Sequence, residues 1–89
     1  MSKRLDSSTH SKIKKNILKK LYSNQAFSKG HLLYERLMSG IPPHLKGSVE
    51  DVLKELLKDE LVLFYGKTKY GDAYQLNIKK LKEIEDAIL

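Results

Sequence analysis

Hydrophobic residues recur along this chain with two different periods, which separate helical from extended segments. An apolar stripe at helical spacing begins after Ser11 and predicts a first helix that ends near Ser23 and Asn24. A second, shorter helix is predicted over residues 31–39, with Ser28 as its candidate N-cap. The apolar positions are Ile13, Ile17, Leu18 and Leu21 in the first stripe and Leu32, Leu33, Leu37 and Met38 in the second.

Glycine and proline mark the entry to a third helix. Gly40 fits the left-handed backbone position that commonly follows a helix, and Pro42 favours an extended residue before it. The helix begins either at Pro43, which is preset for a first turn, or at Ser48, with Asp51 completing a Ser-x-x-acid cap. The sequence leaves both starts open. The apolar stripe of this helix consists of Leu45, Val49, Val52, Leu53, Leu56 and Leu57.

At Leu61 the apolar spacing changes to the alternation of a β-hairpin, whose tip is Gly-Lys-Thr-Lys-Tyr-Gly at residues 66–71. One face of the hairpin is predicted to pair the following side chains across the strands: Val62 and Phe64 with Tyr74 and Leu76. Leu63 and Tyr65 then point the other way.

The chain is predicted to end in a further helix, capped by Asn77, with Leu81, Ile84 and Ile88 as a narrow apolar seam. This seam and the outward pair Leu63 and Tyr65 indicate a contact with a protein partner or with a second copy of the chain.

The distribution of charge is more informative than its total. The 89 residues carry a net charge of +6, which favours a polyanionic partner. Residues 1–22 hold seven basic side chains against Asp6, whereas residues 23–89 hold ten of each sign. We therefore expect a flexible basic arm over residues 1–10, followed by a single domain over residues 11–89.

Several classes of function are disfavoured by what the sequence lacks. There is no cysteine and no apolar run near the roughly 18 residues of a membrane span, so we expect a soluble, cytoplasmic protein without a membrane partner. The histidines, His10, His31 and His44, are far apart and predict no metal site. With no catalytic spacing or phosphate loop, the sequence predicts neither an enzyme nor a cofactor.

The order of helix, helix, proline turn, helix, hairpin and helix resembles the winged helix-turn-helix family over residues 11–78. The Leu-Lys-Asp-Glu-Leu-Val passage at residues 57–62 resembles the step by which such domains enter the wing. Residues 67–71 and the Tyr-Gln-Leu-Asn of residues 74–77 look like the wing of small archaeal members. The resemblance implies an α+β fold with a three-helix core, a two-stranded hairpin wing and a C-terminal helix. It also implies a transcription regulator that binds double-stranded DNA.

The resemblance also implies where DNA would be contacted. The position of the excess charge, rather than the resemblance, predicts phosphate contacts from Lys3, Arg4, Lys12, Lys15 and Lys19. Contacts from the third helix are expected from His44, Lys46, Ser48 and Lys54, and contacts from the wing tip from Lys67, Thr68, Lys69 and Tyr70. Residues 43–60 nevertheless hold three lysines against five acidic side chains, a net charge of −2. This balance supports an alternative function, a winged helix that binds proteins without direct contact to DNA.

Overall fold

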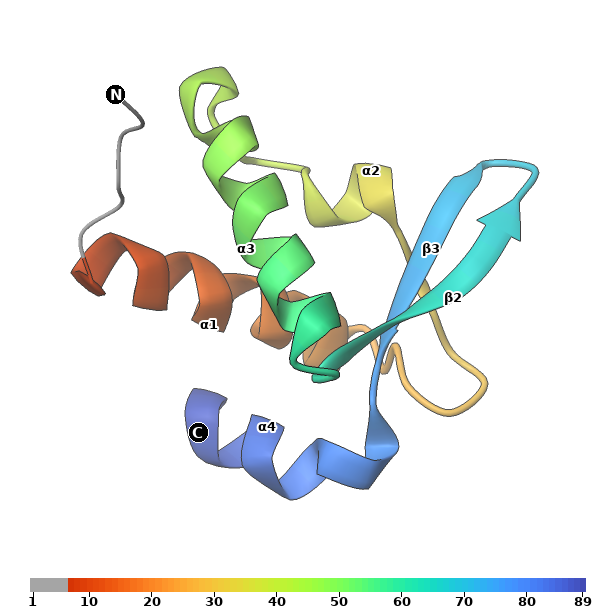
Figure 1. The fold of residues 1–89 in the computed structure, drawn as a ribbon. Helices are drawn as coiled ribbons and strands as arrows, with labels where there is room; N and C mark the ends of the chain where they lie inside the picture. Colours follow the sequence, from red (N-terminus) through yellow and green to blue (C-terminus); the bar gives the residue numbers. More distant parts are fainter. Residues whose placement is uncertain (1–6) are drawn as a thin grey trace.

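The computed structural model describes residues 7–89, which form an α+β fold (Figure 1). Its α-helices are α1 (Ser7–Ser23), α2 (Tyr34–Leu37), α3 (Lys46–Lys58) and α4 (Leu81–Ile88). Its strands are β1 (Leu32–Leu33), β2 (Val62–Thr68) and β3 (Gly71–Leu76). Two 3₁₀ turns, η1 (Pro43–Leu45) and η2 (Ile78–Lys80), lead into α3 and α4. Within residues 7–89, none of the helices combines the length and apolar character that crossing a bilayer requires.

The three strands form one antiparallel sheet in the order β1-β3-β2. The predicted cross-strand companions are confirmed, since Val62 pairs with Leu76 and Phe64 with Tyr74. The sequence pattern indicates only two strands. The third, β1, pairs Leu32 with Tyr74, so β3 is the central strand.

The second helix is shorter than predicted and begins later. Residues 32 and 33 form β1, and α2 spans only Tyr34–Leu37. The predicted N-cap, Ser28, has a φ of +60°, whereas an N-cap residue needs an extended backbone. The predicted start at residue 31 is therefore wrong, because pairing with β3 outweighs the local helical spacing of Leu32 and Leu33.

Three other helix ends can be compared with the sequence. The first helix begins at Ser7, earlier than the predicted Ser11, so residues 7–10 belong to α1 and not to an arm. Two starts were considered for the third helix, Pro43 and Ser48. The structure agrees better with Pro43, because η1 begins there and continues into α3 at Lys46. Asn77 caps η2, the 3₁₀ turn that leads into α4, and not α4 itself: its side chain accepts a hydrogen bond of 3.1 Å from the backbone N–H of Lys79.

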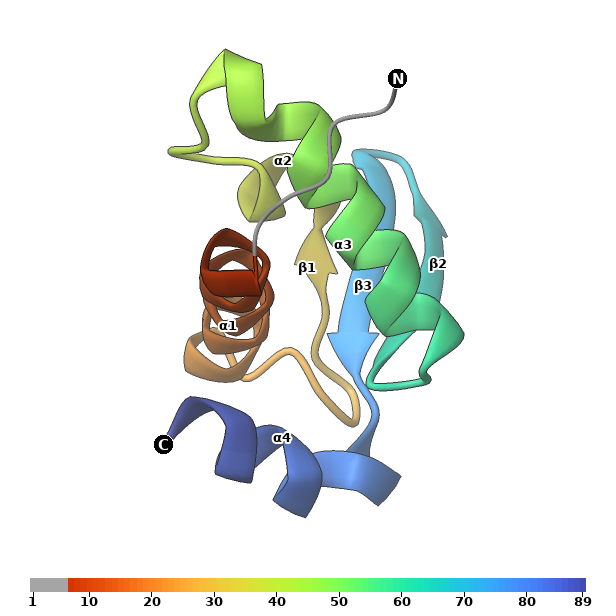
Figure 2. The ribbon, with the colours of Figure 1, turned by 60° about the vertical axis from the view of Figure 1, so that its left-hand side comes forward.

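The apolar stripes predicted from the sequence meet in one core. α1 and α3 cover the same face of the sheet, and α4 lies beneath them (Figure 2). Tyr22 of α1 ties α4 to this core by donating a hydrogen bond of 2.7 Å to Glu85. The buried side chains include Ile17, Leu18, Leu21, Val49, Val52, Leu53, Leu56, Val62, Tyr74, Leu76, Ile84 and Ile88.

The opposite face of the sheet carries an aromatic pair. A β-bulge between Phe64 and Gly66 follows the regular part of β2. Tyr65 is 46% exposed, and its ring stacks on His31 with 4.3 Å between the ring centroids. The two residues come from opposite sides of β3, so their rings meet above that strand, where Ala73 is fully buried. Of the predicted outward pair, Tyr65 is thus exposed, whereas Leu63 is partly buried.

Two glycines provide a matched test of backbone conformation. Gly40 has the predicted left-handed backbone, with a φ of +80°, whereas Gly47 lies in α3, and an added Cβ would meet nothing within 4 Å at either position. We expect Gly40→Ala to lower the free energy of unfolding by about 1–2 kcal/mol through strain in the left-handed region. Gly47→Ala should raise it by up to about 1 kcal/mol through helix propensity. Urea denaturation measures both, and effects of the same sign would contradict this difference.

Candidate nucleic-acid interface

The N-terminal end of α3 carries a lysine ahead of any acidic residue. His44 and Lys46 are exposed and Ser48 is partly buried, and acidic residues begin only at Glu50. The aligned peptide dipoles of α3 add a partial positive charge at the same end. Lys46 also lines an open hollow of about 510 Å³ between α2 and α3, together with Tyr34. This end of α3 is therefore suited to an anionic partner.

Two of the acidic side chains of α3 are bound to neighbouring helices. On a helical wheel, residues 47, 51, 54 and 58 form the outward side, and Glu50 and Glu55 flank it on either edge. Tyr34 of α2 donates its hydroxyl to Oε2 of Glu50. His10 of α1 places its Nε2 at 3.1 and 3.0 Å from the two carboxylate oxygens of Glu55. Within α3 three lysines balance Glu50, Asp51 and Glu55, and the outward side itself holds Asp51 together with Lys54 and Lys58.

The hydrogen bond between Tyr34 and Glu50 has a definite polarity. It raises the pKa of Tyr34 to about 12, with burial and the negative charge of Glu50 as further causes. Tyr34 therefore remains a donor at neutral pH and Glu50 accepts as a carboxylate. Among residues 7–89, no hydrogen-bond partner engages Oε1 of Glu50.

The tip of the hairpin presents cations around a turn that its own side chains close. Thr68 donates a hydrogen bond of 2.8 Å to the carbonyl of Gly71 and accepts one of 3.0 Å from the N–H of Tyr70. Tyr70 is 69% exposed, and Nζ of Lys69 lies 5.5 Å from the centre of its ring. Lys67 is exposed as well. The hydroxyl of Thr68 is thus used in shaping the turn, and the other three predicted wing residues face solvent.

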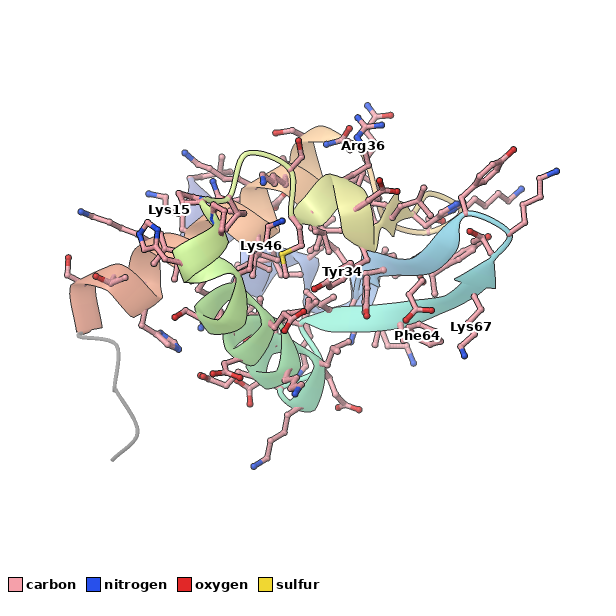
Figure 3. The ribbon with its side chains drawn as sticks, turned by 90° about the horizontal axis from the view of Figure 1, so that it is seen from above. Lys15, Tyr34, Arg36, Lys46, Phe64 and Lys67 are labelled. Carbon is pink, nitrogen blue, oxygen red and sulfur yellow. The ribbon has the colours of Figure 1, made fainter. Side chains whose placement is uncertain are left out.

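The side chains that extend from α1, α2 and the hairpin do not all point the same way. In the view from above, Tyr34, Phe64 and Lys67 project into the angle between α3 and the hairpin (Figure 3). Lys15 and Arg36 project from the opposite side of the molecule in that view. The angle between α3 and the hairpin therefore lies on one side of the molecule, and Lys15 lies on another.

The remaining predicted cations fall into three groups. Lys12 and Lys19 are exposed on α1, and Lys12 lines an apolar groove of about 220 Å³ together with Leu45 at the start of α3. Lys54 is exposed on the outward side of α3. Lys3 and Arg4 lie outside the residues that the structure describes.

Some residues that shape this surface could not be singled out from the sequence. Lys20 of α1 donates hydrogen bonds of 2.9 and 2.7 Å to the carbonyls of Leu37 and Ser39, and burial lowers its pKa. It therefore closes the C-terminal end of α2 rather than facing solvent. Arg36 is exposed on α2 but no apolar or charge pattern marks it. Tyr34, which lies beside the apolar stripe of the second helix, is at the edge of the core and only partly buried.

Residues 7–89 hold no group of three or more His, Cys, Asp or Glu side chains placed to bind a metal ion. Comparisons with protein-family models, with curated proteins and with solved structures found no match to this chain. The function of the chain is therefore inferred from its own geometry and charge.

The Tyr34 hydroxyl provides a pH-dependent test of this surface. Since the ordinary tyrosine pKa is about 10, the bond to Glu50 stabilises the folded state below that pH and is lost as pH rises through about 12. We expect the tyrosinate absorbance of the native protein to show a late component near pH 12 that is absent from Tyr34→Phe. The wild type has five tyrosines and the variant has four. If the variant still shows the late component, that component does not come from Tyr34, and the hydrogen bond to Glu50 is contradicted.

Proposed function

We propose that residues 11–89 form a winged helix-turn-helix domain that binds double-stranded DNA, as a transcription regulator. In this proposal α2 and α3 are the helix-turn-helix pair, and the hairpin of β2 and β3 is the wing. α3 enters the major groove by its N-terminal end, and the wing tip contacts the adjacent backbone or minor groove. The order of α1, β1, α2, α3, β2 and β3 supports this reading of the fold.

The observation that carries the proposal is the placement of α3 and the cationic hairpin on one side. Both diverge from the short turn at residues 59–61, so the start of α3 and the hairpin tip are held apart like the arms of a V (Figure 1). Lys46 is on the first arm and Lys67 and Lys69 are on the second. A duplex that accepts α3 in its groove would have its backbone near the second arm.

The acidic residues of α3 are compatible with this placement. Glu55 is paired with His10, and Asp59 lies beyond the C-terminal end of the helix, whereas Glu50 and Asp51 are exposed carboxylates. No acidic residue of η1 or α3 precedes Glu50, so repulsion from phosphate is weakest at the N-terminal end, where His44 and Lys46 are exposed.

A second function, binding of a protein partner or a second copy, rests on the aromatic pair on the other face of the sheet. Tyr65 is 46% exposed there, and no helix of residues 7–89 covers this face (Figure 2). In this alternative α3 makes no contact with DNA, and the exposed face of the sheet and α4 provide the contacts.

Replacement of the wing lysines tests the proposed interface. We expect Lys67→Ala with Lys69→Ala to weaken binding to all duplexes alike. The slope of log K against log salt should fall by nearly 1 for each phosphate that the protein no longer binds. The matched control is Lys79→Ala with Lys82→Ala, which removes the same charge from η2 and α4 at the far end of the molecule (Figure 1). Equal salt slopes for the two double variants would mean that the wing does not contact DNA.

Salt titration separates DNA binding from the protein-binding alternative. The wild type should bind a random-sequence duplex measurably at about 20 mM salt, a concentration we choose because electrostatic attraction is then screened only beyond about 20 Å. Fluorescence anisotropy of a labelled duplex gives the affinity, and light scattering of the free protein gives its mass. Failure to bind DNA, together with a dimeric mass that Tyr65→Ser reduces to a monomer, would favour the alternative.

A further inference from the structure

One carboxylate oxygen in the proposed interface is oriented but has no partner among residues 7–89. Tyr34 holds Oε2 of Glu50, which leaves Oε1 as an acceptor on an exposed side chain. Tyr34 itself projects into the angle between α3 and the hairpin (Figure 3). An acceptor held in this way is suited to a hydrogen-bond donor on the partner, and the donors that a DNA major groove offers are the amino groups of cytosine and adenine.

We infer that Glu50 determines the sequence specificity of this protein by accepting a hydrogen bond from the N4 amino group of a cytosine in duplex DNA. The inference rests on the proposed function. It adds to that function the base that is recognised, cytosine, and the residue that recognises it, Glu50. Cytosine is favoured over adenine because it presents only a donor at this edge. The adjacent N7 of adenine is an acceptor, which would repel the second lone pair of a carboxylate.

The position of Glu50 along α3 agrees with such a contact. It lies one helical turn after Lys46, which corresponds to about 5.4 Å along the helix axis. This length is comparable to one or two base-pair steps of about 3.4 Å each. Lys46 can therefore donate to a guanine beside the cytosine that Glu50 selects.

The other acidic residues of α3 are less suited to this role. Both oxygens of Glu55 are already engaged by His10, at 3.1 and 3.0 Å. Asp51 is exposed on the outward side and has a shorter side chain, which no neighbouring residue among 7–89 orients. Glu50 alone combines exposure, a fixed orientation and an unused acceptor atom.

Tyr34 then acts as a positioning residue. A carboxylate near phosphate is repelled, and a flexible glutamate would turn away from the duplex on binding. The hydroxyl of Tyr34 restrains Glu50 before DNA arrives, so the orientation withstands this repulsion. Removing the hydroxyl should therefore affect base preference while leaving general attraction to DNA intact.

The test is selection of binding sites from a library of random duplexes, with each variant's folding checked by its thermal unfolding. The wild-type site should contain a C·G pair at which replacement of cytosine weakens binding about tenfold. Glu50→Gln should shift the preference at that position towards adenine, because an amide offers both a donor and an acceptor, and Glu50→Ala should abolish it. An unchanged preference in Glu50→Ala overturns the inference.

Glu55→Gln is the matched control, since it removes the same charge from the opposite edge of α3. It should tighten binding to all sequences equally and leave the cytosine preference unchanged; loss of the preference in this variant as well would mean that charge and not contact selects the base. Tyr34→Phe should reduce the preference without changing the salt slope, and full retention of the preference would exclude Tyr34 as a positioning residue.

The outcomes distinguish the two proposals from each other. A wild type that binds no duplex at low salt contradicts DNA binding itself. If the wild type binds duplexes but shows no preference for cytosine that is lost in Glu50→Ala, only the specificity assigned to Glu50 is contradicted.

Discussion

The central position of β3 determines how the rest of the molecule is arranged. It pairs with β2 on one edge and with β1 on the other, and the N–H of Leu76 donates a hydrogen bond of 2.7 Å to the carbonyl of Ala26. The side chain of Gln75 adds hydrogen bonds of 2.9 Å to the carbonyls of Ser28 and Gly30. The connection between α1 and α2 is thereby fixed to the hairpin.

The polar contacts between helices have a second effect, on the distribution of charge. Tyr34 and His10 each engage a glutamate at one edge of α3, and Lys20 is taken up by the C-terminal carbonyls of α2. Formal charges counted along a helix therefore describe its surface poorly. Lys46 at the start of α3 and Lys67 and Lys69 at the hairpin tip are exposed and take no part in these contacts.

Local patterns in the sequence predicted the elements whose stability is local. The stripes of α1 and α3 and the pairing of Val62 with Leu76 follow from apolar spacing, and Gly40 and Asn77 follow from the backbone conformations that end and begin helices. β1 could not be predicted, because its two residues are extended only through pairing with residues about forty positions later. The bonds from Tyr34 to Glu50 and from His10 to Glu55 likewise join residues 16 and 45 positions apart, and no periodicity marks such pairs. The interface residues were thus predicted from residue type alone, whereas the hydrogen bond that orients Glu50 became visible only in three dimensions.

The late place of β3 in the chain has a consequence for synthesis. A nascent polypeptide emerging from the ribosome can form α1 and α3 early, because their hydrogen bonds are local. The sheet, however, cannot close until residues 71–76 are available, and until then Leu32 and Val62 lack the strand that pairs with both β1 and β2. Their exposed apolar edges are the kind of surface that chaperones bind. Newly made copies should therefore depend on rapid completion of translation through residue 76 to avoid association with one another.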